Sequence, residues 1–407
     1  MTFLSKKLKR KFPIFSKKIN GHPLLYLDSA ATTQKPKNVI DTLTRFYLHE
    51  YGTVHRAIYS LSLEATEKYD AAREAVRDFI HAKHVEEIVF TRGTTDSINL
   101  VALSFGKRLE PGDEILVSEA EHHSNLVPWQ MLAKERGIKL IFIPINDKGE
   151  IVLDEYKRRL TPQTKLVSIA HIFNTTGVVN PVKEMIQLAH EVGAKVMIDG
   201  AQAIAHTPVD VQDLHADFYA FSGHKAYGPT GVGVLYGERE ILKQLTPIQG
   251  GGDMVERATL EETTYRQIPL CFEAGTPMIA EVIAFKEAIA FLKEVGIQNI
   301  QRHEQKLLEM MTVELQKIPG LKIYGTSPNK GAIISFLQEG IHHLDIGTLL
   351  DLKGVAVRSG QHCSHPSMDR FGIEGTVRVS FGLYNTVEDV KRFVALLLET
   401  ISYLQRK

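Results

Sequence analysis

The sequence predicts an α/β protein, with a mostly parallel sheet of seven strands in a large domain and a smaller α+β domain. Between about residues 85 and 237, seven short apolar runs alternate with helix-like segments. This alternation is typical of a parallel sheet that is buried between two layers of helices. After the triplet Gly250 to Gly252, the chain changes to long helical patterns and a few short strands. With 407 residues, 43% of them hydrophobic, the chain can bury a core in each domain.

The large domain is predicted over residues 21–294, and its elements follow in chain order. Apolar residues from Ala65 to Ile80 recur at helical spacing and predict a helix before the first strand. Short apolar runs predict strands at 86–93, 113–118, 138–145, 164–172, 194–199, 216–222 and 231–236. Helices are expected between these strands at 94–109, 124–137 and 182–193.

The small domain is predicted over residues 1–20 and 295–407. A long helix at 277–296 leads into it, and short strands are expected at 331–337, 355–359 and 376–381. The basic start of the chain, "MTFLSKKLKRKFPIFSKK", lacks the apolar stretch of a signal peptide. It therefore predicts a solvated helix on the surface.

Composition excludes several classes of function. Lys+Arg and Asp+Glu both number 48, so the formal net charge is zero and no electrostatic footprint for nucleic acid is present. No apolar run approaches the roughly 20 residues that a membrane-spanning helix needs. Two cysteines, Cys271 and Cys363, do not make a disulfide framework. We expect a soluble protein of the cytoplasm.

Polar residues follow the predicted strands at the end where an open α/β sheet binds its ligands. The strongest signal is "FSGHKAYGPTGVG", because Lys225 lies in a glycine-rich stretch with little bulk around it instead of on a solvated face. The other strands end in candidate partners for it: Thr94, Thr95, His122, His123, Asn174, Asp199, Gln202, Ser222 and His224.

These residue types suit a cofactor such as pyridoxal phosphate, held on Lys225 as a Schiff base. The helix that begins at Thr94 and Thr95 offers free backbone N–H groups to a phosphate, with Ser222 and His224 as further donors. Asp199 would pair with the pyridine nitrogen, and Gln202 would donate to the ring oxygen. His123 would stack on the ring and move protons. Singly, an aspartate at a strand end is more often a cap, and a histidine pair in a loop more often lies on the surface.

Four stretches, "SGHKAYGPTGVGVLY", "IDGAQA", "TRGTTDSINLVA" and "EHHSNLVPWQ", resemble the class V aminotransferase-like, fold-type I pyridoxal phosphate enzymes. The resemblance extends from Tyr26 to Val390 and is greatest to the SUF-type (group II) cysteine desulfurases. It implies pyridoxal 5′-phosphate on Lys225 and a homodimer in which Thr276 reaches the phosphate of the neighbouring subunit. It also implies a SufE-like or SufU-like sulfur acceptor and a role in iron–sulfur cluster assembly.

Cys363 lies in a polar loop, "VRSGQHCSHPSMDRFG", and is the candidate nucleophile. Nearby Arg358, His362 and His365 would favour its thiolate, and the resemblance implies that it receives the sulfur. The loop departs from the group II pattern at Gln361 and at Ser364 to Pro366. A metal site at His362, Cys363 and His365 is an alternative, but the sequence offers no fourth ligand.

Three residues are the candidates for binding the substrate: Asn174, Arg358 and Arg378. Arg378 is placed on a strand where it would hold a carboxylate in bidentate fashion, although an ordinary ion pair is the alternative. The predicted reaction converts L-cysteine to L-alanine and leaves a persulfide on Cys363. A transaminase, a selenocysteine lyase or cysteine sulfinate desulfinase, and a non-enzymatic protein that kept the fold are the alternatives.

Overall fold

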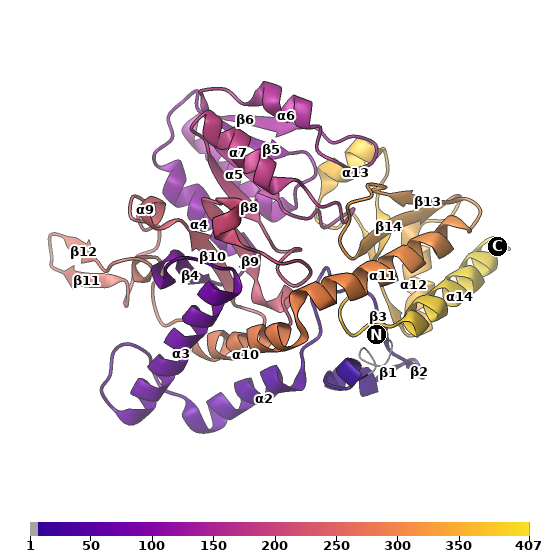
Figure 1. Cartoon of the computed structure of the whole chain (residues 1–407), viewed down its shortest axis with the longest axis horizontal. Coiled ribbons are helices and arrows are strands. Elements are labelled where there is room, and N and C mark those ends of the chain that lie inside the picture. The colour runs from indigo at the N-terminus through magenta and orange to yellow at the C-terminus, as the bar shows by residue number, and fades with distance from the viewer. Residues whose placement is uncertain (1–6, 407) are drawn as a thin grey trace.

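The computed structural model describes residues 7–406, which form a larger and a smaller lobe side by side (Figure 1). The larger lobe is built on a seven-stranded sheet, and the smaller lobe on a four-stranded sheet. Helix α10 (Ile279–Val295) belongs to the larger lobe and α11 (Ile297–Gln316) to the smaller one, so that the chain passes between the lobes at Gly296.

All seven strands predicted for the large sheet are confirmed. Their order is β4-β10-β9-β8-β7-β5-β6, and every pair is parallel except those that β10 makes with its two neighbours. The antiparallel strand is β10, the last of the seven along the chain. The other six strands run in one direction, so their carboxyl ends lie at the same edge of the sheet. The strands are β4 (Ile88–Thr91), β5 (Glu114–Ser118), β6 (Lys139–Ile143), β7 (Thr164–Ala170), β8 (Lys195–Asp199), β9 (Phe218–Ser222) and β10 (Gly233–Gly237).

Helices cover both faces of this sheet because successive strand residues point to opposite sides and are apolar on both. Ile115 and Val117 pack in a core with α4 (Thr94–Gly106) and α5 (Val127–Arg136), while Leu116 joins the opposite core. The helices on that opposite face include α3 (Ser60–Phe79), α7 (Val182–Glu191) and α10. The remaining helices of the larger lobe are α2 (Lys37–Arg45), α6 (Leu153–Arg159), α8 (Val211–Leu214) and α9 (Arg239–Leu242).

The smaller lobe packs its helices on an antiparallel sheet of order β13-β14-β17-β16. Its core joins side chains of α11 and α14, such as Leu307 and Phe393, to Phe336 and Val377 on the strands. The elements are β13 (Leu321–Tyr324), β14 (Ile333–Gln338), β16 (Arg358–Gly360), β17 (Thr376–Ser380), α12 (His343–Leu352), α13 (His365–Phe371) and α14 (Val387–Leu404).

The strand predicted at 355–359 is split into two. Its first part, β15 (Val355–Ala356), pairs in parallel with β3 (Leu25–Tyr26), and its second part, β16, pairs with β17. The chain changes partner at Val357 because β3 covers only the first two residues. This change brings Arg358 opposite Arg378.

The N-terminal segment contacts both lobes. Phe12 is buried against Tyr227, Phe291 and Tyr384, whereas Leu25 joins the core of the smaller lobe. Residues 1–6 of the predicted basic helix lie outside the described residues, and the division of the chain into residues 21–294 and the rest stays a prediction. Short elements complete this segment: η1 (Pro13–Ser16), β1 (Lys18–Ile19) and β2 (His22–Pro23).

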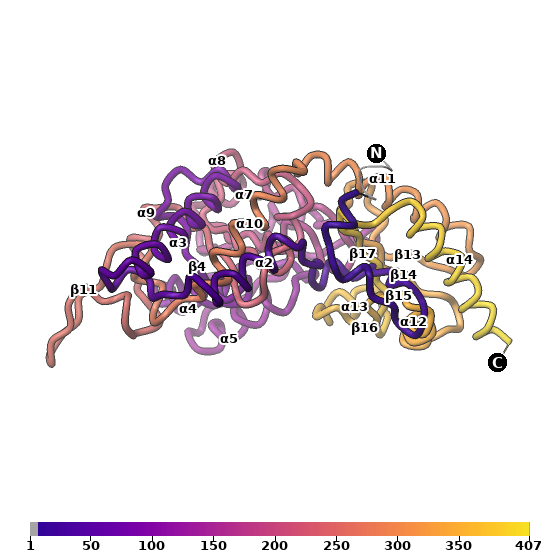
Figure 2. The backbone as a smooth tube through the Cα atoms, turned by 90° about the horizontal axis from the view of Figure 1, so that it is seen from below, coloured from indigo at the N-terminus to yellow at the C-terminus, as the bar shows by residue number. Residues whose placement is uncertain are grey.

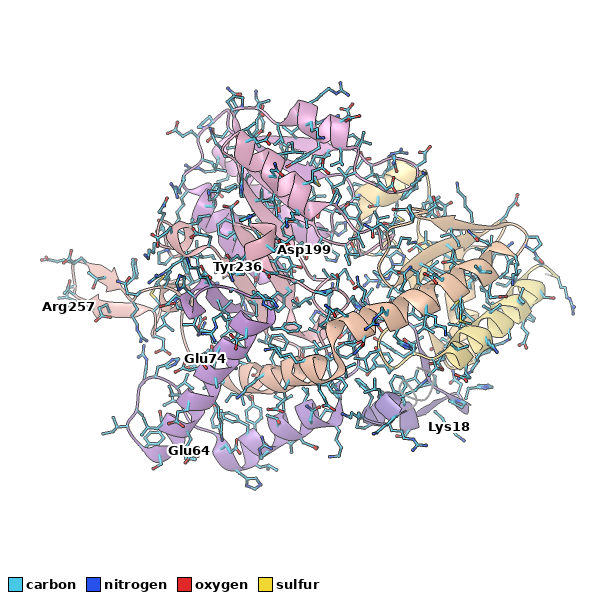
Figure 3. All side chains as sticks on the ribbon, in the orientation of Figure 1. Lys18, Glu64, Glu74, Asp199, Tyr236 and Arg257 are labelled. Atoms are coloured by element: carbon cyan, nitrogen blue, oxygen red, sulfur yellow. The ribbon has the colours of Figure 1, made fainter. Side chains whose placement is uncertain are left out.

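A hairpin of β11 (Val255–Ala258) and β12 (Thr263–Tyr265) projects from the larger lobe, at the end of the molecule opposite α14 (Figure 2). Leu260 at its tip is fully exposed. Asp199, in contrast, lies in the interior of the larger lobe (Figure 3).

Between Lys7 and Arg406, no helix is both long and apolar enough to span a membrane.

Candidate active site

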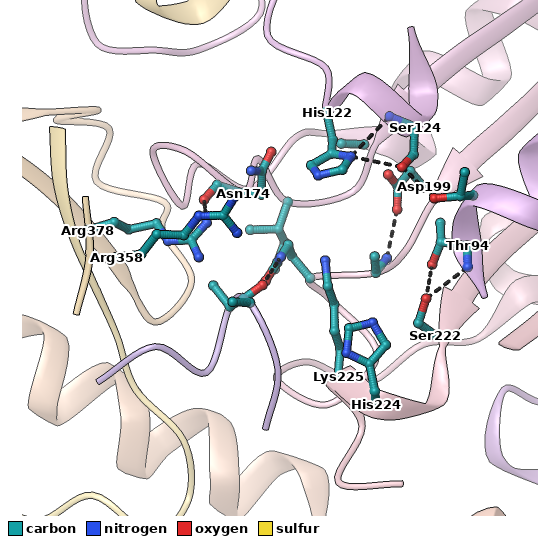
Figure 4. A pocket seen from close by; sticks show the side chains of 17 residues that line it. Thr94, His122, Ser124, Asn174, Asp199, Ser222, His224, Lys225, Arg358 and Arg378 are labelled. Atoms are coloured by element: carbon teal, nitrogen blue, oxygen red, sulfur yellow. Dashed lines mark hydrogen bonds between the residues drawn. The ribbon is translucent and has the colours of Figure 1, made fainter. Parts of the chain in front are cut away.

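One pocket collects most of the polar residues that follow the strands of the large sheet (Figure 4). It lies at the carboxyl ends of the parallel strands, where the sequence placed it, and the smaller lobe closes it with two arginines. The predicted residues that line it are Thr94, Thr95, Asn174, Asp199, Gln202, Ser222, His224, Lys225, Arg358 and Arg378. The structure keeps three other predicted residues out of this lining: His123, Thr276 and Cys363.

Lys225 ends a short 3₁₀ turn, η5 (Gly223–Lys225), directly after β9, and its side chain extends into the pocket (Figure 4). Burial lowers the pKa of its amine to about 8, although the carboxylate of Asp199 opposes this effect. Arg378 and Arg358 lower the same pKa further. A much larger fraction of the amine is therefore neutral, and nucleophilic, near neutral pH than in a solvated lysine.

The peptide group before Lys225 is held by an unusual number of donors. The carbonyl oxygen of His224 accepts hydrogen bonds from the backbone N–H and Oγ1 of Thr33 at 3.0 Å each. It also accepts from Thr32 Oγ1 at 3.1 Å and from Lys35 Nζ at 2.8 Å. Four donors from residues 32–35 thus fix the backbone that carries the lysine. Sequence reasoning missed this role, since no local pattern links residues so far apart.

The N-terminus of α4 forms the side of the pocket away from the arginines. Ser222 Oγ accepts a hydrogen bond from the backbone N–H of Thr94 at 2.8 Å and shares another with Thr94 Oγ1 at 2.7 Å. Thr95 Oγ1 bonds to Ser124 Oγ at 2.6 Å. Free backbone N–H groups, the helix dipole and these hydroxyls together favour an anion.

Asp199 and Gln202 line the pocket from the end of β8 and the loop after it. One carboxylate oxygen of Asp199 accepts a hydrogen bond from the backbone N–H of Ala201 at 2.9 Å. Burial raises the pKa of Asp199, while the charge of Lys225 lowers it. Gln202 is fixed by a hydrogen bond from Nε2 to the carbonyl oxygen of Ala30 at 2.7 Å. A buried carboxylate of this kind requires a cationic partner in the pocket.

The histidine that lines the pocket is His122, not His123. Nδ1 of His122 accepts a hydrogen bond from the backbone N–H of Ser124 at 3.1 Å, so the proton of the neutral ring is on Nε2. Burial, with smaller effects of nearby cations, lowers the pKa of His122 to about 3. The prediction that His123 stacks on a ring in the pocket is therefore corrected, because its ring turns to His365 instead.

That correction concerns a choice between neighbours. The sequence "EHHSN" marks both histidines. The direction of each side chain depends on η4 (His123–Asn125), a short 3₁₀ turn that precedes α5. In this turn His122 is the N-cap. Its ring bonds back to the backbone N–H of Ser124 in the same turn, and the local sequence does not distinguish the two histidines.

Arg378 is buried on β17 and held from two sides. Nη1 donates to the carbonyl oxygen of Asn174 at 2.9 Å, and Nη2 donates to Asp28 Oδ1 at 3.1 Å. Its Nε is buried and, among residues 7–406, has no hydrogen-bond partner. Arg358 lines the same pocket and donates from Nη2 to Cys363 Sγ at 3.2 Å. Arg378 therefore brings a fixed positive charge to the pocket, and Arg358 connects the pocket to the thiol.

The loop of Cys363 is held against the larger lobe. Asn174 Nδ2 donates to the carbonyl oxygen of His362 at 2.7 Å. The backbone N–H of His123 donates to the carbonyl oxygen of Cys363 at 2.8 Å. Nε2 of His362 bonds to Thr376 Oγ1 at 2.8 Å, away from Cys363 and His365. The three side chains do not converge, and the described part of the chain contains no group of three ligands suited to a metal.

Thr276 is exposed at a second cleft, which it lines with Glu273 and Arg92. Glu273 is anchored there by Arg73, whose Nη1 and Nη2 donate at 2.6 and 2.8 Å. Within a single chain, Thr276 does not reach the pocket of Lys225.

Pyridoxal 5′-phosphate fits the donor set of the main pocket. Lys225 supplies an amine for its aldehyde, and the start of α4 with Ser222 supplies donors for its phosphate. Asp199 supplies the carboxylate that a protonated pyridine needs.

Comparisons with known proteins agree with this fit. The family described as aminotransferase class-V matches residues 25–393. A probable cysteine desulfurase of Vibrio cholerae serotype O1 is 45% identical over 398 residues, which is 98% of each chain. A cysteine desulfurase of Synechococcus elongatus is 47% identical over 391 residues, 96% of this chain but only 62% of that protein. The structure of the cysteine desulfurase CsdA from Escherichia coli superposes with a TM-score of 0.92 at 39% identity, covering 98% of both chains.

Proposed function

The chain belongs to the class-V aminotransferase family of fold-type I pyridoxal phosphate enzymes, and from this premise we propose that it is a cysteine desulfurase. It would take sulfur from L-cysteine, release L-alanine and hold the sulfur as a persulfide on Cys363. The observation that carries the proposal is the contact of Arg358 with Cys363 Sγ, because it joins a thiol to the pocket of Lys225.

Arg378 is the proposed clamp for the substrate carboxylate. Its Nε is buried and has no partner within residues 7–406, while Asp28 and the carbonyl of Asn174 fix the remainder of the guanidinium. Arg378 also lines the pocket, so a carboxylate there would pair with this buried cation. The substrate would then be oriented between the arginines and Lys225 (Figure 4).

Lys225 would act at the reacting carbon of the substrate, and Asp199 at the pyridine nitrogen of the cofactor. When bound, pyridoxal phosphate withdraws electron density from Cα and Cβ of the substrate, and Asp199 supports this by keeping the pyridine nitrogen protonated. The Lys225 amine, whose pKa burial lowers to about 8, is suited to take the Cα proton. Ser222, Thr94 and the start of α4 would hold the phosphate end.

Cys363 would act as the nucleophile on sulfur. Its thiolate, held by Arg358, attacks the substrate sulfur, and a new S–S bond forms while the C–S bond breaks. The electron pair of that bond stays with Cβ, which gains a proton and becomes the methyl group of alanine. Nε2 of His122 carries a proton toward the pocket and replaces His123 as the proposed group for moving protons at the substrate.

We also propose the assembly that the sequence predicted. Thr276 is exposed and lies outside the pocket of its own chain, as a residue that completes the phosphate site of a neighbouring subunit would. A homodimer would satisfy this arrangement. We place the protein in the SUF-type (group II) subgroup in the cytoplasm, with a SufE-like or SufU-like acceptor that carries the sulfur to iron–sulfur cluster assembly.

The test is incubation of the purified, cofactor-loaded protein with L-cysteine and dithiothreitol, followed by assays of alanine and sulfide. Equal amounts of both are expected from the wild type, and neither from Cys363→Ala. Cys271→Ala is the matched control, because burial raises the pKa of that thiol to about 11 and it lies outside the pocket. A keto acid without sulfide would show a transaminase. Selenocysteine lyase activity that survives Cys363→Ala would show the other alternative.

A further inference from the structure

The loop that carries Cys363 adopts a strained backbone. His362 and Cys363 both have positive φ angles, of 55° and 59°. Non-glycine residues in this left-handed region are disfavoured, and two in succession persist only where surrounding contacts hold them. The contacts that hold this loop therefore decide whether the thiol stays beside Arg358.

Ser364 makes the first side-chain contact with the larger lobe. It is fully buried, and its Oγ donates to the carbonyl oxygen of Glu121 at 3.0 Å. The same oxygen bonds to Ser367 Oγ at 2.7 Å, within the loop's own helix α13. The hydroxyl of Ser364 thus contacts the larger lobe, and the hydroxyl of Ser367 holds it in place through their hydrogen bond.

His365 makes the second contact. Its Nδ1 lies 2.9 Å from His123 Nε2, and its backbone N–H donates to the same nitrogen at 3.3 Å. Since the backbone N–H can only donate, His123 Nε2 is the acceptor and His365 Nδ1 carries the proton. The two rings are within 5° of parallel.

The turn that receives both contacts is rigid. Glu121 is fully buried and accepts hydrogen bonds from Ser118 Oγ at 2.5 Å and from Asn125 Nδ2 at 2.7 Å. Asn125 Oδ1 in turn accepts from Ser168 Oγ at 2.5 Å. The network ties the turn at residues 120–123 to strands β5 and β7.

We propose that Ser364 and His365 dock the Cys363 loop on the turn at residues 120–123 and act as positioning residues for the nucleophile. This inference rests on the proposed function. Docking keeps the thiol beside Arg358 for attack, and afterwards it shields the persulfide from small thiols. The two residues therefore favour capture of the sulfur and slow its premature release.

The docking predicts opposite changes in two rates, which loss of folding would not produce. The first rate is the formation of the Cys363 persulfide in a single turnover, followed by the mass of the peptide that carries it. The second is the loss of that sulfur to dithiothreitol from persulfidated enzyme freed of L-cysteine. In this step a thiolate takes the outer sulfur, Cys363 leaves as thiolate, and the second thiol closes the dithiothreitol ring and expels hydrosulfide.

In Ser364→Ala and His365→Ala holoenzyme, we expect the first rate to fall and the second to rise, each by about two- to tenfold, the effect of one hydrogen bond. Hydrogen exchange of residues 358–372 should become faster without substrate. Ser367→Ala removes the hydroxyl that bonds to Ser364 and should act in the same direction but more weakly, whereas His365→Asn should preserve a donor near the position of Nδ1 and stay close to the wild type. His123→Ala should match His365→Ala, and the double variant should not add to either.

Rates that fall together, rates that do not change, or unchanged hydrogen exchange would overturn the docking role. The failure of the proposed function is distinct from these outcomes. If wild-type protein gains no sulfur on Cys363 from L-cysteine, the function is wrong, and the exchange of residues 358–372 still decides whether Ser364 and His365 dock the loop.

Discussion

Arg358 and Arg378 lie directly opposite each other on neighbouring antiparallel strands, and both line the pocket of Lys225. Two like charges in a cross-strand pair repel unless each has an anion. Asp28 contacts Arg378, and Cys363 Sγ contacts Arg358. In the proposed reaction the two arginines therefore have different roles: Arg378 binds the substrate carboxylate, and Arg358 holds the attacking thiolate.

Replacing Arg378 by lysine should weaken the binding of the substrate carboxylate. A lysine keeps the charge but cannot form the planar, two-point contact. We expect KM for L-cysteine to rise by about tenfold to a hundredfold, the effect of one charged hydrogen bond of about 1.5–3 kcal/mol. Cysteamine, which lacks the carboxylate, is the control substrate. An equal effect on both substrates would show that Arg378 acts on the fold of the site and not on the carboxylate.

Replacing Asp199 by asparagine should slow turnover while the protein stays folded. The loss of the charge opposite the pyridine nitrogen should lower kcat by about a hundredfold or more, as the removal of a preorganised electrostatic group does. Asp217→Asn offers a matched control, because Asp217 is also buried and accepts a hydrogen bond from the backbone N–H of Val196 at 2.8 Å, but outside the pocket. It should lower the melting temperature and leave kcat nearly unchanged. The reverse pattern would contradict the role of Asp199.

The rate at which the cofactor-free protein takes up pyridoxal phosphate should depend on pH through Lys225. Burial lowers the pKa of this amine to about 8, and only the neutral amine attacks the aldehyde. The rate should therefore rise from pH 6 to about pH 8 and then level off, instead of rising toward pH 10.5. Stopped-flow absorbance of the bound cofactor measures it, with Lys225→Arg as the blank. A rate that still climbs above pH 9 would place the pKa near its ordinary value.

His122 and His123 should differ sharply when each is replaced by alanine. His122 lines the pocket, so His122→Ala should lower the single-turnover rate by about a hundredfold, the typical contribution of a positioned acid or base. His123→Ala should lower it only a few-fold, through the docking of the loop. Because the pKa of His122 is about 3, its protonation should leave no limb in the pH–rate profile between pH 5 and 9. Equal losses in the two variants would contradict this assignment.

Much of the fold follows from local patterns in the sequence. The seven strands are short apolar runs, and parallel strands bring their carboxyl ends together, so the residues after them share one pocket. The split of residues 355–359 into β15 and β16 was not predictable, because it depends on pairing with β3, more than 300 residues away in the chain.

The details of the site depended on direction and distance, which the sequence does not encode locally. A turn decides whether His122 or His123 faces the pocket, and a shift of one residue reverses the answer. The ion pair of Arg378 with Asp28 spans 350 residues, and neither neighbourhood carries a sign of it. Polar contacts of this kind are recognised only after the lobes are in place.

The four hydrogen bonds to the carbonyl oxygen of His224 bear on how the protein is handled in the laboratory. They come from residues 32–35, so a segment within the first tenth of the polypeptide supports the catalytic centre. A truncation that starts after Lys35, or a cleavable affinity tag whose removal trims this stretch, amounts to an active-site mutation. Expression vectors should therefore preserve the start of the chain through Lys35, and a tag belongs at the opposite terminus, beyond α14.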